Sequence, residues 1–155
     1  MINVSLALFA RLGLYLCNMD TPKRTIETRE DVSYLVRSFY AKVREDDFIG
    51  HFFNETITDW EGHLEKLTDF WQGNLLGIPG YKGRPPMEHI KLDYAYGHVI
   101  EPAHFGQWLN LWINTLDEKF EGPKVDVAKD KARQLAEFFM FRIYNARPQT
   151  TPQID

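Results

Sequence analysis

Apolar side chains recur at steps of three and four residues along most of this chain, and that spacing constrains its fold more than any other feature. Such steps bring side chains onto one face of an α-helix, whereas a half-buried strand would need strict alternation of apolar and polar residues. No alternating run is long enough to build a sheet, and no internal repeat occurs. The sequence therefore predicts an all-α domain.

The helical segments can be placed from their boundary residues. Thr28, with Asp31 three residues later, resembles a capping arrangement at the start of the first helix. We interpret Gly50 as a break after that helix, 52–53 as a buried corner and 77–86, rich in glycine and proline, as a loop. The further segments predicted to be helical are 59–76, a short helix from Pro86, 102–120 and 124–144.

Composition limits the partners of this chain. Its 155 residues suit one domain, with 18 Lys and Arg against 22 Asp and Glu for a net charge of −4. No clustered basic patch is present, which argues against nucleic acid as a partner. The single cysteine, Cys17, excludes an intrachain disulfide and an iron–sulfur site, and it fits a reducing, cytoplasmic setting.

Both ends of the chain are expected to lie outside the domain, which we place at 26–146. Residues 1–25 form an N-terminal extension whose apolar part is too short and interrupted to span a membrane and is a poor secretory signal. Translation starting at Met19 is an equally weighted alternative to a genuine extension. Residues 147–155 are expected to be a disordered tail.

Histidine spacing favours haem over zinc. No two of the five histidines are three or four residues apart, so no helix face carries a zinc pair. Haem requires only one neutral imidazole and a flat apolar slot. His89, which follows the rigid loop, suits the role of that imidazole. Tyr40 lies on the apolar stripe of the first helix, so its buried hydroxyl needs a partner, and a bound dioxygen would be one.

Each of these residues also has an ordinary structural interpretation. Histidines such as His89 are common at exposed helix starts, and buried tyrosines such as Tyr40 commonly bond a backbone carbonyl. His63 suits a solvent-facing helix edge, and Trp108 and Trp112 suit a core. The residues support a haem site only as a set, and a cofactor-free helical interaction module remains open as an alternative.

An ordered series of motifs resembles the truncated-haemoglobin family, its third group in particular. The series spans about 31–142 and consists of FYAKV at 39–43, DWEGH at 59–63, DFW at 69–71, LLG at 75–77, YKGRPPMEH at 81–89 and HFGQWL at 104–109. The resemblance implies a globin-like, truncated two-over-two helical sandwich around haem b, iron protoporphyrin IX. It implies that His89 is the proximal ligand of the iron and that Tyr40 faces the gas ligand.

The resemblance also implies the remaining contacts of the cofactor. His63 matches the distal histidine position, Trp108 reaches the distal pocket, and Phe53 packs on the haem. The full set of expected cofactor-binding residues is Tyr40, Phe53, His63, Leu67, Trp71, His89 and Trp108. The cations available to the haem propionates are Lys66, Lys82, Arg84 and Lys91, among which the sequence does not choose. Two segments depart from the family pattern: 91–100 looks longer than the usual link to the next helix, and the stretch before Met19 has no counterpart.

The function implied is reversible binding of O₂ and of other small ligands such as CO, NO or peroxide. Charge-assisted hydrogen bonds from Tyr40 and Trp108, at about 1.5–3 kcal/mol, would slow O₂ release roughly ten- to a hundredfold. Slow release suits sensing or redox chemistry better than transport. The alternative is peroxidase-like or NO-removing activity with His63 as acid or base and an external reductase as electron donor. The absence of an arginine on the stripe of His63 speaks against a peroxidase.

Overall fold

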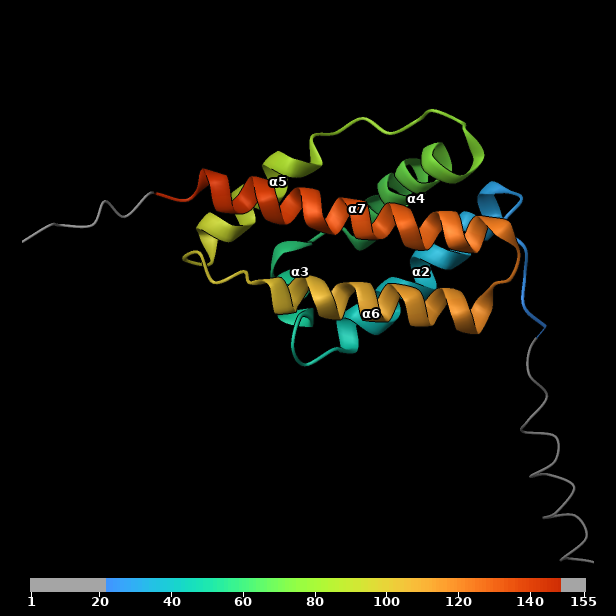
Figure 1. Ribbon diagram of the computed structural model, residues 1–155, viewed down its shortest axis with the longest axis horizontal. Coiled ribbons are helices and arrows are strands. Elements are labelled where there is room, and N and C mark those ends of the chain that lie inside the picture. Colours follow the sequence, from blue (N-terminus) through green and yellow to red (C-terminus); the bar gives the residue numbers. More distant parts are fainter. Residues whose placement is uncertain (1–21, 149–155) are drawn as a thin grey trace, which may run out of the picture.

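The computed structural model describes residues 22–148, and these form six helices without a strand (Figure 1). Their bounds are α2 Arg29–Glu45, α3 Gly50–Thr56, α4 Trp60–Leu76, α5 Pro85–Ala95, α6 Pro102–Lys119 and α7 Pro123–Ala146. α6 and α7 pack against each other, and α2 packs against both α4 and α6. α5 lies against the second half of α7. The all-α prediction is confirmed, and none of the helices within 22–148 is long and apolar enough to cross a membrane.

The chain does break after the first helix, at residues 46–49, but Gly50 itself is not the break. Gly50 is the first residue of α3, and the predicted corner at 52–53 lies inside that helix. A Cβ at position 50 would stand 2.8 Å from the carbonyl oxygen of Val43 and 3.2 Å from that of Arg44. Glycine is therefore needed here because α3 approaches the end of α2 closely, not because the chain is irregular.

The other helix boundaries follow the predicted signals. Thr28 and Asp31 form a reciprocal capping box at the start of α2. Gly77 ends α4 with φ +69°, a left-handed conformation that costs glycine little. α5 begins with prolines at its first positions, where the missing N–H would have no helical partner. The predicted helix at 124–144 extends slightly further at both ends as α7.

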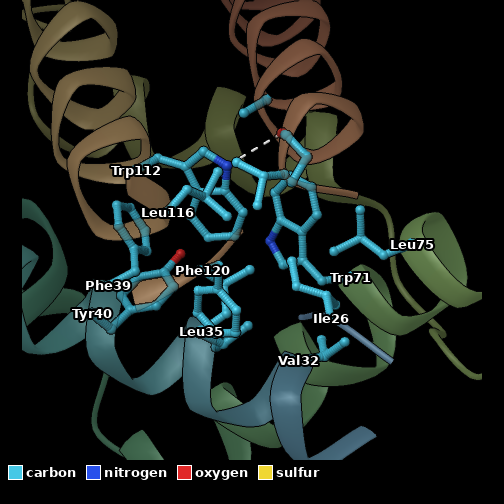
Figure 2. Packing of buried hydrophobic residues seen from close by; sticks show 14 of the residues in the cluster. Ile26, Val32, Leu35, Phe39, Tyr40, Trp71, Leu75, Trp112, Leu116 and Phe120 are labelled. Atoms are coloured by element: carbon cyan, nitrogen blue, oxygen red, sulfur yellow. Dashed lines mark hydrogen bonds between the residues drawn. The ribbon is translucent and has the colours of Figure 1, made fainter. Parts of the chain in front are cut away.

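The core lies where α2, α4, α6 and α7 meet (Figure 2). Trp71 of α4 stacks on Trp112 of α6 with ring centroids 4.3 Å apart, and both side chains are almost wholly buried. The indole N–H of Trp112 donates to the backbone carbonyl of Ala128 at 3.2 Å. The small buried side chains of Ala128 and Ala132 on α7 leave room for these large rings.

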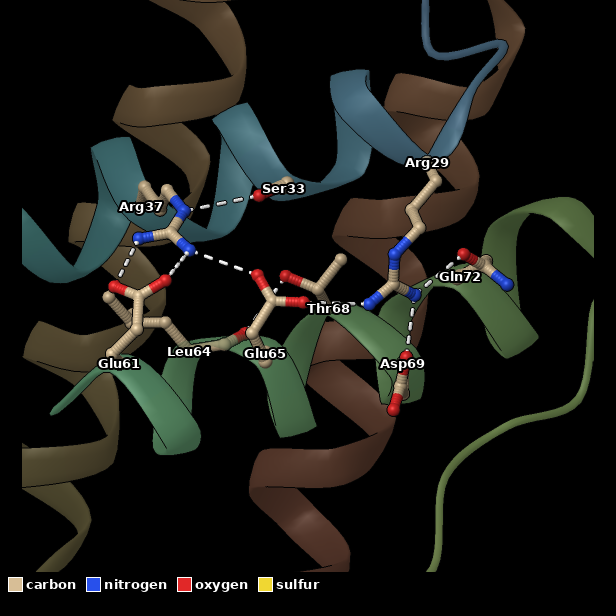
Figure 3. Close-up of polar contacts among 9 residues, drawn as sticks. All are labelled: Arg29, Ser33, Arg37, Glu61, Leu64, Glu65, Thr68, Asp69 and Gln72. Atoms are coloured by element: carbon tan, nitrogen blue, oxygen red, sulfur yellow. Dashed lines mark hydrogen bonds and ion pairs between the residues drawn. The ribbon is translucent and has the colours of Figure 1, made fainter. Parts of the chain in front are cut away.

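A row of ion pairs joins α2 to α4 (Figure 3). Arg29 contacts Glu65 at 2.9 Å and also Asp69, while Arg37 contacts Glu61 and, at 3.0 Å, Glu65. Arg29, near the start of α2, pairs with acids further along α4 than those that pair with Arg37, so the two helices run antiparallel. Because Glu65 serves both arginines, the row fixes where along α2 the residues of α4 lie.

The end of α5 is tied to the end of α7 by a buried carboxylate. Asp93 is 2% exposed and receives two hydrogen bonds from Arg147, at 2.7 and 2.9 Å. His98 donates to it through Nδ1 at 2.9 Å, and the backbone N–H of Ile100 donates at 3.3 Å. Residues 97 and 98 both have positive φ, so the chain turns back sharply after Ala95. The 91–100 segment thus consists of the last turns of α5 and this compact turn.

The structure also bears on the two ends of the domain. Arg24, which the sequence assigned to the extension, donates from its backbone N–H to the carbonyl of Lys119 at 2.9 Å, and Ile26 is buried. Arg147, assigned to the tail, is anchored on Asp93. The proposed alternative start at Met19 and the tail from 149 onward lie outside the described residues.

Candidate functional site

One cavity brings together all seven residues expected to bind the cofactor. It has an interior volume of about 210 Å³ and lies between α4, α5, α6 and α7, with Tyr40 of α2 and Phe53 of α3 at one side. Its wall is mainly aliphatic and aromatic, as is usual for sites that hold a flat apolar ligand. The predicted residues on its wall are Tyr40, Phe53, His63, Leu67, Trp71, His89 and Trp108.

His89 is fixed in one tautomer by its own helix. Its Nδ1 lies 2.7 Å from the carbonyl oxygen of Pro85, one turn earlier in α5. A carbonyl can only accept, so Nδ1 carries the proton and Nε2 keeps its lone pair. Burial lowers the pKa of His89, outweighing the opposing effects of the Pro85 carbonyl and of Glu88, and so favours the neutral ring. The ring stacks on Phe139 of α7 at 4.2 Å. A neutral imidazole with one free nitrogen is the form that binds a metal.

Tyr40 offers a hydroxyl proton on another part of the wall. Burial raises the pKa of Tyr40 above its ordinary value, and the neighbouring Trp108 side chain opposes that rise. An indole N–H can only donate, so Trp108 favours the phenol oxygen as an acceptor. Its ring lies against the rings of Phe39, Phe53, Trp60 and His63, and among the described residues no hydrogen-bond acceptor faces its hydroxyl proton. The hydroxyl proton therefore remains available to a ligand in the cavity.

His63 lies beside Tyr40, with the two rings perpendicular and their centroids 5.7 Å apart. Burial lowers the pKa of His63, and the positive charge of Lys66 one turn later lowers it further. The ring is therefore neutral near pH 7, because its ordinary pKa of about 6.5 is shifted down. Lys66 is itself part of the cavity wall, whereas the other cations considered for the propionates, Lys82, Arg84 and Lys91, are absent from its lining.

Several wall residues were not among the predicted contacts. Tyr81 and Pro85 come from the loop before α5 and its first residue, and Phe139 comes from α7. Phe139 follows Leu135 by four residues within the predicted helix 124–144, so its apolar spacing was the signal that could have found it. Phe52 also lines the cavity beside Phe53 and is the more buried of the two. No spacing rule separates these two adjacent residues.

A family model described as bacterial-like globin matches residues 25–145. The chain belongs to that family. This bacterial-like globin is 30% identical over 120 residues to the group 3 truncated hemoglobin ctb of Campylobacter jejuni, covering 75% of this chain and 91% of the relative. The resemblance to group III truncated haemoglobins is thus confirmed.

Solved structures confirm the globin fold. The crystal structure of the group III truncated hemoglobin from Campylobacter jejuni superposes with a TM-score of 0.71 at 28% identity, covering 83% of this globin and all of that chain. The 2/2 hemoglobin from Synechococcus sp. PCC 7002, solved in the cyanomet state with covalently attached heme, gives 0.59 at 21% identity over 76% of this chain and 92% of that one. The second likeness concerns the fold alone, and both support the two-over-two helical sandwich.

The cavity fits the haem that membership of the globin family implies. Its wall supplies a neutral imidazole with a free Nε2, apolar side chains for a flat ring, and a hydroxyl proton without a protein acceptor among the described residues. Globins as a family bind small diatomic ligands. Within 22–148 no group of three or more His, Cys, Asp or Glu side chains could hold a metal ion by itself, so one imidazole and a porphyrin account for the donor set better than a bare cation does.

Proposed function

We propose that this globin holds haem b through His89 and binds O₂ and related diatomic ligands beside Tyr40. The observation that carries the proposal is that one apolar cavity wall presents two groups without a partner among the described residues. They are the Nε2 lone pair of His89 and the hydroxyl proton of Tyr40. Phe53, Leu67 and Phe139 would pack against the porphyrin, and Lys66 is the favoured partner for a propionate because it alone of the four candidates lines the cavity.

Haem b is favoured over a thioether-linked haem by cysteine content. Attachment of the c type uses two cysteines followed by a histidine, and this chain has a single cysteine. Without a thioether link, the proximal bond and the apolar walls would retain the group. Stacking of His89 on Phe139 and its bond to Pro85 hold the imidazole in one orientation, which is the usual role of groups behind a ligating histidine.

When bound, haem supplies an iron site at which a diatomic ligand gains partial negative charge. Tyr40 then acts as the hydrogen-bond donor to that ligand. Trp108 would act through Tyr40: its N–H, donated toward the phenol oxygen, would direct the hydroxyl proton away from the indole, in keeping with the lowering effect of Trp108 on the pKa of Tyr40. Trp108 is itself held by parallel stacking on Trp112, with centroids 5.9 Å apart and planes within 4°. The donor is therefore oriented before a ligand arrives.

The O₂ dissociation rate of a phenylalanine variant tests this role of Tyr40. Loss of a hydrogen bond worth about 1.5–3 kcal/mol should speed release by roughly ten- to a hundredfold. Tyr81→Phe makes the same chemical change on the same wall and should leave the rate within about twofold, because Tyr81 is not the proposed donor. Equal rates in Tyr40→Phe and the parent protein would remove Tyr40 from the site.

The coordination of His89 is tested independently of O₂. His89→Ala should lose the visible-absorption signature of the parent protein, and added imidazole should restore it by filling the place of the side chain. If haem bound to His89→Ala keeps the axial coordination of the parent protein, another residue is the ligand and the assignment fails.

A second candidate function is peroxidase-like or NO-removing turnover with an external reductant. The half-buried, neutral ring of His63 beside Tyr40 favours it, since a neutral imidazole can take a proton from peroxide. No arginine of the described residues lines the cavity, so the charge that peroxidases usually supply would fall to Lys66. Turnover with peroxide that survives in His63→Ala would exclude His63 as the base. Membership of a haem-binding family argues against the cofactor-free interaction module.

A further inference from the structure

A polar hollow lies at the surface on the far side of the wall that carries Tyr40. It forms where α2, α3 and the start of α4 meet, and its lining is Ala41, Arg44, Glu45, Asn54 and Trp60. None of these five residues lines the cavity described above. The hollow and the cavity are therefore separate spaces that meet at a common partition.

Trp60 is that partition. Its ring lies 6.1 Å from the Tyr40 ring and 6.0 Å from the His63 ring, and both of those residues line the cavity. The same indole lines the polar hollow. A ligand that passed from the hollow to the space beside Tyr40 and His63 would have to displace this side chain.

Arg44 holds Trp60 from the side of the hollow. The guanidinium carbon of Arg44 lies 4.4 Å from the centroid of the Trp60 ring, within the range of a cation–π contact. The backbone carbonyl of Arg44 also accepts a hydrogen bond from the Asn54 side chain at 2.9 Å, which ties α3 to the end of α2. This hydrogen bond helps to hold the frame of the hollow in place.

The partition itself is tied less firmly than its frame. Trp60 is the first residue of α4, directly after the short link of residues 57–59 from α3. Its ring is only partly buried: it packs against the core cluster from outside, lies tilted to the Tyr40 ring and edge-on to the His63 ring, and contacts the cation of Arg44. Side chains held in this way change rotamer far more readily than the fully buried Trp112 of the core.

We propose that small uncharged ligands reach Tyr40 and His63 from the polar hollow, and that Trp60 determines which of these ligands can pass. This inference rests on the proposed function, because the passage leads to the proposed ligand site. A diatomic molecule passes during a brief displacement of the indole. A longer ligand needs the indole to stay displaced while it passes, so Trp60 selects by size.

Association rates of CO and of n-butyl isocyanide with the ferrous full-length protein test the proposal. If the open arrangement is about 10% populated, removing the partition should raise the CO rate by about tenfold. In Trp60→Ala we expect that increase for CO and a larger one for the isocyanide, so that the ratio of the two rates falls. Trp60→Phe should give an intermediate result and serves if the alanine variant folds poorly. Phe138→Ala removes an exposed aromatic side chain from the outer face of α7 and should change neither rate.

Arg44→Met provides a second readout, the environment of the Trp60 ring itself, beside the ligand association rates. With 5-fluorotryptophan in all four tryptophan positions, ¹⁹F NMR of the diamagnetic CO complex gives a resonance for Trp60, identified by its loss in Trp60→Phe. Loss of the cation should shift or broaden that resonance alone and should raise the CO rate. A shifted resonance with an unchanged CO rate would show a loosened ring that does not control passage, and would overturn the proposal.

The outcomes separate this inference from the proposed function. If His89 and Tyr40 behave as proposed while both Trp60 variants bind CO and the isocyanide at parent rates, only the role of Trp60 is wrong. If the protein takes up no haem, both proposals fail together.

Discussion

Arg147→Met would leave the carboxylate of Asp93 buried without its main partner. The side chain of Asp93 is 2% exposed and that of Arg147 19% exposed, so the pair is well shielded from water. Removing one partner of a buried pair costs about 3–5 kcal/mol. His98 stays 2.9 Å from the carboxylate and softens the loss, so we expect about 3 kcal/mol of lost unfolding free energy near pH 7.

The pH dependence gives this prediction its sign. Burial alone would raise the pKa of Asp93, but hydrogen bonds from Arg147 and His98 and the charge of Arg147 outweigh it, and the pKa lies below its ordinary value. A carboxyl whose pKa is depressed in the folded state stabilises the protein above its unfolded pKa of about 3.9, and that contribution fades as the pH falls through the folded pKa. In Arg147→Met burial dominates, so the pKa of Asp93 rises above the unfolded value and protonation relieves the cost.

Urea unfolding at fixed protein and haem concentrations measures both effects, because haem linkage then contributes equally to parent and variant. The difference in unfolding free energy should be largest near pH 7 and should shrink toward pH 4.5. A double variant, Arg147→Met with Asp93→Leu, should recover part of the loss by removing the stranded charge. A cost below about 1 kcal/mol at pH 7, or a difference that grows on acidification, would refute the reasoning, since either would place the pair in effective contact with water.

Three further outcomes are expected. Gly77→Ala should cost about 1 kcal/mol in urea unfolding, because φ +69° disfavours an L side chain even though a Cβ there meets no atom within 4 Å; an unchanged midpoint would contradict that cause. Arg37→Met, whose contact with Glu61 is largely exposed, should cost less than about 1 kcal/mol and less still in high salt, and a cost that salt leaves unchanged would speak against a surface pair. Trp108→Phe should speed O₂ release by a smaller factor than Tyr40→Phe, since it removes the group that orients the donor and leaves the donor in place; an equal effect would mean that Trp108 itself contacts the ligand.

Local signals were enough to predict five of the six helices of the described region: apolar spacing of three to four residues for α2, α4, α6 and α7, and a proline at the helix start for α5. α3 was missed because a glycine in the sequence indicates the end of a helix unless the segments that pack closely against it are known. The reason for Gly50 is the approach of α3 to Val43 and Arg44, and only the assembled fold supplies it. The pairing of Asp93 with Arg147 across 54 residues was likewise beyond any local signal.

The site likewise has some features set by local sequence and others set only by tertiary packing. The tautomer of His89 is a local property, since the accepting carbonyl belongs to Pro85 four residues earlier on the same helix. What Trp108 does is a tertiary property. Its place on the inner face of α6 was predictable, but its nearness to the Tyr40 hydroxyl depends on how α6 packs against α2. The sequence motif alone would lead one to count two independent donors to the ligand. In the role we propose, Trp108 instead orients the Tyr40 hydroxyl, and its contribution is then conditional on that hydroxyl. In a double variant of the two, the effects on O₂ release should therefore fall short of additivity.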